Sequence, residues 1–91
     1  MSMFSLEFDT IFFQEGSAIV AYCPELDVSS CGNNIEQARV NLKTAVRLFV
    51  EEAQKMGTLL DILEECSFTQ TSESAWQPPR LVATEIMSLA A

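Results

Sequence analysis

The chain has 91 residues, of which 13 are acidic and five are basic, so its formal net charge is −8. Nearly half of the residues, 48%, are apolar, which is ample for a folded domain and too much for a disordered chain. Affinity for nucleic acid comes largely from Lys and Arg side chains that displace counterions, so this composition disfavours binding to phosphate backbones or anionic lipid. The length predicts one domain, residues 1–91. Its core is thin, since a chain this short buries roughly 60–65% of its unfolded surface, and self-association is a reasonable expectation.

Three strands are predicted before residue 33. Residues Phe4 to Phe12 alternate apolar and polar side chains, the period of a half-buried strand. A short loop around Gly16 then suits a hairpin, and Ala18 to Cys23 is apolar on both faces, as in a central strand that Pro24 ends. Asp27 to Cys31 is a weaker third strand. Because the loops are short, neighbouring strands should be antiparallel.

Two helices are predicted next. Asn34 can cap the first, with Gln37 completing a capping box, and Gly57 suits the left-handed position after its last residue. Thr58 can cap a second, shorter helix that runs to about Cys66. The first helix carries one broad apolar stripe that should pack on a sheet face: Ile35, Ala38, Leu42, Ala45, Val46, Phe49, Ala53 and Met56.

The C-terminal quarter predicts a flexible connection over residues 69–79 and a final strand over residues 80–89. The connection is polar, and Pro78-Pro79 forces an extended backbone. The final segment alternates like a strand but could also form a short helix; its β-branched Val82, Thr84 and Ile86 favour the strand. The predicted fold is therefore α+β in two layers: an antiparallel three-stranded meander, a long helix on one face, a short second helix and an added C-terminal strand.

The cysteines and the terminal segments predict a reduced, cytoplasmic protein without a metal or other cofactor. Cys23, Cys31 and Cys66 form an odd set with no C-x-x-C spacing, and there is no histidine to complete a zinc site. No basic segment followed by an apolar core opens the chain, and its apolar runs are far shorter than the roughly 20 residues that span a bilayer. Cys23 lies in a strand pattern, where a buried thiol is the common case.

The order of these motifs resembles the small antitoxin family typified by HicB. The resemblance covers residues 4–66 and rests on the aromatic strand and hairpin to Gly16, the run Val-Ala-Tyr-Cys-Pro-Glu-Leu at 20–26, and the capped helix that follows Gly32. The sequence departs from the family at Asp27-Val28, where many members have Pro-Gly. The resemblance implies a trimmed ribonuclease H fold without catalytic carboxylates, whose members neutralise HicA, a small basic RNA-cleaving toxin.

Full-length members of that family also carry a C-terminal DNA-binding domain. Here the residues after Cys66 form a polar loop and one apolar segment, with Arg80 as their only basic residue. Direct DNA binding is therefore not expected.

The candidate partner-binding residues lie at the end of the second strand. Glu25 and Asp27 are acidic residues on the predicted turn, although a loop acid is often merely solvated. Tyr22 and Pro24 belong to the family motif, and each also has a structural reading, as a strand-end aromatic and a strand terminator.

A second set of candidates concerns self-association, and the sequence predicts a homodimer or a larger homo-oligomer. Val40 and Leu48 project away from the apolar stripe, and Trp76 lies beside the diproline. Leu81 and Val82 begin the apolar C-terminal segment, which could add as a strand to a sheet edge of its own or another subunit.

Two other groups of charged residues do not predict a site. Arg39, Lys43 and Arg47 follow one helix flank, but Glu36 and Glu51 stand at ion-pair spacing, which favours a neutralised face over an RNA-binding stripe. Asp9, Glu64 and Glu65 lack further carboxylates to complete a metal site.

The sequence therefore predicts a non-catalytic protein-binding domain, HicB-like, that occludes a basic HicA-type toxin. The alternative is a solitary homo-oligomeric structural or regulatory module of the same fold. A nuclease would need clustered carboxylates that the sequence does not visibly supply.

Overall fold

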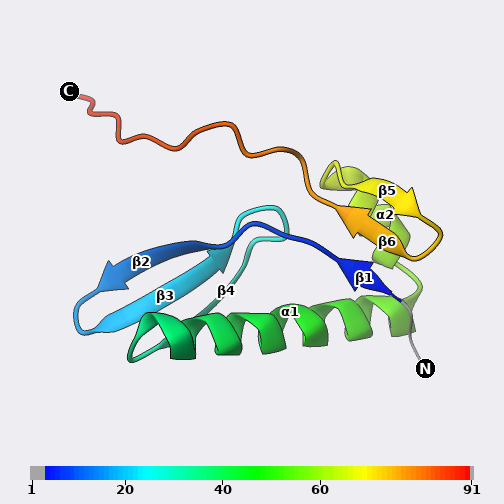
Figure 1. Ribbon diagram of the computed structural model, residues 1–91, viewed down its shortest axis with the longest axis horizontal. Helices are drawn as coiled ribbons and strands as arrows, with labels where there is room; N and C mark the ends of the chain where they lie inside the picture. The colour runs from blue at the N-terminus through cyan, green and yellow to red at the C-terminus, as the bar shows by residue number, and fades with distance from the viewer. Residues whose placement is uncertain (1–3, 91) are drawn as a thin grey trace.

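The computed structural model describes residues 4–90 and has the predicted α+β class, with a long helix packed against a sheet (Figure 1). Eight elements follow one another: β1 (Ser5–Leu6), β2 (Ile11–Glu15), β3 (Ala18–Cys23), β4 (Val28–Gly32), α1 (Ile35–Met56), α2 (Leu59–Glu65), β5 (Thr69–Ser72) and β6 (Ala75–Gln77).

The predicted meander is the three-stranded sheet β2-β3-β4, antiparallel throughout. β3 is the central strand, as its apolar sequence indicates, and Pro24 directly follows its last residue. Gly16 turns the β2–β3 hairpin with φ 61°, a left-handed conformation that glycine adopts without strain.

A second sheet, β1-β6-β5, contains the chain's earliest and latest strands. β1 pairs parallel with β6, and the backbone N–H groups of Ser5 and Glu7 donate to the carbonyls of Ser74 and Trp76 at 2.7 and 3.0 Å. The single strand predicted from Phe4 to Phe12 is thus divided: its two halves, β1 and β2, belong to different sheets.

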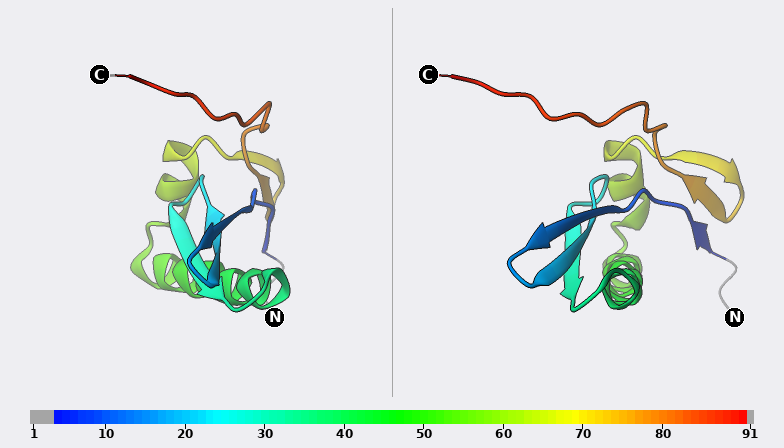
Figure 2. Two further views of the ribbon diagram at one scale, coloured as in Figure 1. Left: turned by 90° about the vertical axis from the view of Figure 1, so that its left-hand side faces the viewer. Right: turned by 60° about the vertical axis from the view of Figure 1, so that its left-hand side comes forward.

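The segment after α2 differs from the sequence prediction. Residues 69–79, expected to be a flexible connection, contain the β5–β6 hairpin, and the last strand is β6 instead of residues 80–89. Every residue of β5 is exposed, so its polar sequence has no apolar alternation and resembles a loop. Trp76 on β6 is only 8% exposed and anchors the hairpin in the core. Residues 78–90 form no helix or strand and leave the folded body as an extended tail (Figures 1 and 2).

The predicted caps of α1 are confirmed. The Asn34 side chain accepts a hydrogen bond from the Gln37 backbone N–H at 2.8 Å, and the Gln37 side chain accepts one from the Asn33 N–H at 2.6 Å. Gly57 ends the helix in the left-handed region, at φ 72°. Thr58 precedes α2 but makes no side-chain cap, since its hydroxyl lies 3.5 Å from the carbonyl of Ala53 instead.

The core lies between α1 and the meander, with β4 and β3 against the helix. The buried residues of α1 are Ala38, Leu42, Val46, Val50 and Ala53. Ile35 and Met56, which the apolar stripe included, are the first and last residues of this 22-residue helix and are 49% and 67% exposed. Gly32 allows β4 to meet the helix closely: a Cβ there would lie 2.7 Å from the Ala38 nitrogen.

Candidate functional site

The turn that joins β3 to β4 holds three of the four predicted partner-binding residues, and Tyr22 lies on β3 just before it. Asp27 is exposed and has φ 56°, a left-handed conformation that aspartate tolerates better than most residues. The Tyr22 hydroxyl donates a hydrogen bond of 2.9 Å to the Asp27 carboxylate, and this bond is the first cause that raises the pKa of Tyr22. The Asp27 carboxylate therefore faces solvent in a fixed orientation.

Glu25 has a different environment on the same turn. Its side chain is half-buried, and its carboxylate accepts hydrogen bonds from the Asp9 backbone N–H at 3.2 Å and from the Cys23 thiol at 3.5 Å. Burial, followed by the neighbouring Asp9 carboxyl, raises the pKa of Glu25 above its usual value. Glu25 thus holds the turn against the segment between β1 and β2.

Pro24 and Leu26 complete the turn. Pro24 is half-buried and cannot continue the β3 ladder, whereas Leu26 is 8% exposed and belongs to the core. With one apolar anchor and the bonds of Glu25 and Asp27, the turn is well fixed, which lowers the entropy that binding a partner would cost.

Two of the three thiols, those of Cys23 and Cys66, are not activated as nucleophiles. Cys23 is fully buried, as predicted for a strand cysteine, and burial raises its pKa to about 11, which keeps it protonated near neutral pH. Burial also raises the pKa of the Cys66 thiol. Within residues 4–90, no three His, Cys, Asp or Glu side chains are placed to hold a metal ion, and no helix of that range is long and apolar enough to cross a membrane.

The predicted interface residues have different positions. Val40 and Leu48 on α1 are 54% and 59% exposed, and Leu81 and Val82 on the tail are 51% and 89% exposed. Trp76 is not at a surface: it belongs to the hydrophobic core of its own chain. A lone Trp beside a diproline predicts an interface residue from sequence, and that prediction is wrong because Trp76 packs in the core.

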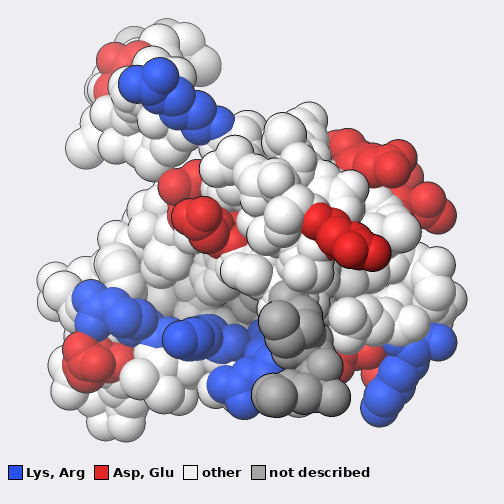
Figure 3. All heavy atoms as spheres, turned by 45° about the vertical axis from the view of Figure 1, so that its right-hand side comes forward, with Lys and Arg blue, Asp and Glu red and all other residues white. Residues whose placement is uncertain are grey.

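The basic flank of α1 is only partly neutralised. Arg39 pairs with Glu36 at 2.7 Å, and its guanidinium lies 5.5 Å from the centre of the Phe12 ring. Lys43 and Arg47 form no ion pair with any residue in the range 4–90, so the pairing of Arg47 with Glu51 that helical spacing predicts is not formed. In Figure 3 several basic side chains lie along the lower part of the molecule, with acidic side chains beside them at both ends and others above.

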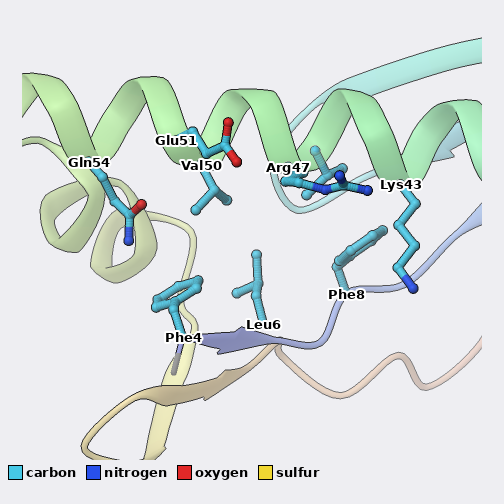
Figure 4. Close-up of a pocket in the computed structure, with 9 residues that line it drawn as sticks. Phe4, Leu6, Phe8, Lys43, Arg47, Val50, Glu51 and Gln54 are labelled. Atoms are coloured by element: carbon cyan, nitrogen blue, oxygen red, sulfur yellow. The ribbon is translucent and has the colours of Figure 1, made fainter. Parts of the chain in front are cut away.

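Lys43 and Arg47 instead line a groove between β1 and α1 (Figure 4). The groove has a volume of about 400 Å³ and is lined by Phe4, Leu6, Phe8, Lys43, Val46, Arg47, Val50, Glu51 and Gln54. Sequence reasoning missed it because its two walls are some 40 residues apart in the chain. The only available signal was the apolar alternation of Phe4, Leu6 and Phe8.

Comparison with protein-family models, with curated proteins and with solved structures finds no match to this chain. A functional assignment must therefore start from the acidic turn, the groove and the tail.

Proposed function

We propose that this protein is a non-catalytic binding domain that neutralises a small basic RNA-cleaving protein of the HicA type. The observation that carries the proposal is the Asp27 carboxylate, exposed at a fixed turn and oriented by the Tyr22 hydroxyl at 2.9 Å. A preoriented acid on a protein of net charge −8 suits a partner whose RNA-binding face is basic.

The mechanism is occlusion. The acidic turn would take the place of RNA phosphates on the partner's basic face, and the surrounding excess of acids would steer the encounter. Because Glu25 is held within the turn, its contribution is to support Asp27 through the fixed backbone.

The arrangement of strands also supports the proposal. An antiparallel meander, a covering helix and a later strand parallel to the N-terminal one are compatible with the trimmed ribonuclease H fold that the sequence resemblance implies.

The test is inhibition of a purified HicA-type ribonuclease, measured as protection of a labelled RNA, with binding followed by calorimetry. Asp27→Asn keeps the left-handed backbone and an oxygen that accepts from Tyr22, and removes only the charge. We expect it to raise the dissociation constant about tenfold and to reduce its salt dependence. Glu73→Gln, at an exposed acid on the β5–β6 turn, is the matched control and should leave binding within about twofold.

The proposal fails if the parent protein neither binds nor inhibits such a ribonuclease, or if Asp27→Asn and Glu73→Gln have equal effects. The second candidate function is a solitary homo-oligomeric module, which the exposed apolar tail favours. Binding to itself but to no basic ribonuclease would select it.

A further inference from the structure

The extended tail, residues 78–90, carries apolar side chains that its own chain does not cover. The exposed fractions are 51% for Leu81, 89% for Val82, 98% for Ile86, 83% for Met87 and 93% for Leu89. So much apolar area in one short segment marks an interaction site. Pro78 and Pro79 hold the backbone extended, and the tail runs apart from the helices and strands (Figures 1 and 2).

The groove between β1 and α1 is complementary to the tail, because it offers apolar side chains at its floor and charged ones at its rim. Its floor is apolar and is formed by Leu6 of β1, by Phe4 and Phe8 on either side of that strand, and by Val46 and Val50 of the helix. Its rim is charged along α1, with Lys43 and Arg47 towards the Phe8 end and Glu51 towards the Phe4 end (Figure 4).

We propose that this groove binds the tail of a second copy of the chain, so that two copies exchange tails in a homodimer. Val82 and Ile86 lie on one side of an extended chain, four residues or roughly 13 Å apart. Phe4 and Phe8 are also four residues apart and both line the groove, so Val82 and Ile86 can face its floor together. Glu85 then lies on the opposite side of the tail, at the level of the rim.

The charges set the direction of the bound tail. A tail parallel to β1 has Val82 near Phe4 and Ile86 near Phe8, so Glu85 comes to Lys43 and Arg47. In the reverse direction Glu85 would instead come towards Glu51, a like charge.

The chain's own β2 edge is the less favourable destination for the tail. In the β1–β6 ladder Leu6 pairs with Trp76, 70 residues later. If the tail continued this ladder along β2 in the same register, Glu85 would lie beside Glu15. Like charges directly opposite one another destabilise a strand pair. Pro78 and Pro79 also lack the N–H groups that a continued β6 ladder needs.

The test uses the full chain alone, so its outcome is separate from that of ribonuclease binding. Dimer dissociation constants are measured by sedimentation equilibrium for the parent, Ile86→Asp and the matched control Ser88→Asp, which adds the same charge to the tail. Both positions are exposed, so neither change disturbs the fold. We expect Ile86→Asp to raise the dissociation constant at least tenfold, and Ser88→Asp no more than about threefold.

A charge exchange then locates the contact. The pair Lys43→Glu and Arg47→Glu, and separately Glu85→Lys, should each raise the dissociation constant about three- to tenfold. All three changes in one chain should restore it to within about twofold. The proposal is overturned if the parent stays monomeric up to about 1 mM, if Ile86→Asp leaves the dimer intact, or if the combined charge exchange gives no restoration.

Discussion

Leu42→Ala is the sharpest test of how the core is arranged. Leu42 lies in the middle of α1, is 1% exposed and is among the largest fully buried side chains of the described residues. Truncation removes its methyl groups from the contact between helix and meander and leaves a cavity, which costs about 2–5 kcal/mol. Domains of this size have a free energy of unfolding of about 5–15 kcal/mol, so the loss is a large share of the total.

Leu48→Ala is the matched control on the same helix. Leu48 is 59% exposed, so the same change of residue should cost less than about 0.5 kcal/mol. Thermal melts should place Leu42→Ala at least about 10 °C below the parent, since each kcal/mol lowers Tm by about 4–8 °C in a domain of this length. Equal melting temperatures for the two variants would refute the assignment of the buried helix face.

Three further changes test the N-terminal cap of α1, the close approach of β4 to α1, and the turn between β3 and β4. Asn34→Ala removes the 2.8 Å cap of α1 and should cost about 0.5–2 kcal/mol in urea unfolding. Gly32→Ala forces a Cβ to within 2.7 Å of the Ala38 nitrogen, so we expect a loss of about 1–3 kcal/mol in the same assay. Glu25 binds its proton more tightly in the folded state than in the unfolded one, so its contribution to stability falls as pH rises from its ordinary pKa through the raised value. Urea unfolding midpoints of the parent and of Glu25→Gln are measured from about pH 4 to pH 7. The variant should lack the fall in stability that Glu25 causes in the parent, and identical pH profiles would contradict the burial of Glu25.

The meander and the first helix could be predicted from sequence because their signals are local. Alternation, a hairpin glycine and a capping box act within a few residues, and they correctly predicted β3, the start of α1 and its end at Gly57. The second sheet could not be predicted in this way. It depends on β1 meeting β6 some 70 residues later, and the exposed polar residues of β5 give no strand signal.

In the candidate site, too, local features could be predicted from the sequence and contacts with distant segments could not. Asp27 at an exposed turn could be recognised from residue type and position. The burial of Glu25 and of Trp76 depends on contacts with distant segments: the Asp9 backbone for Glu25 and the core for Trp76. Helical spacing alone also could not tell that Arg39 would pair with Glu36 while Lys43 and Arg47 would face a groove.

The small contact between β1 and β6 has a consequence for the order in which the molecule opens. The β1–β6 ladder has only two register pairs, Ser5 with Ala75 and Leu6 with Trp76, and it joins segments some 70 residues apart in the chain. Long loops are closed late in folding, and weakly held segments exchange their amide hydrogens through local opening instead of global unfolding. The amides of β1 and β6 should therefore exchange before those of β3. Since β1 forms one wall of the groove, an occupant of the groove has to slow that exchange, by the factor that its concentration and dissociation constant set.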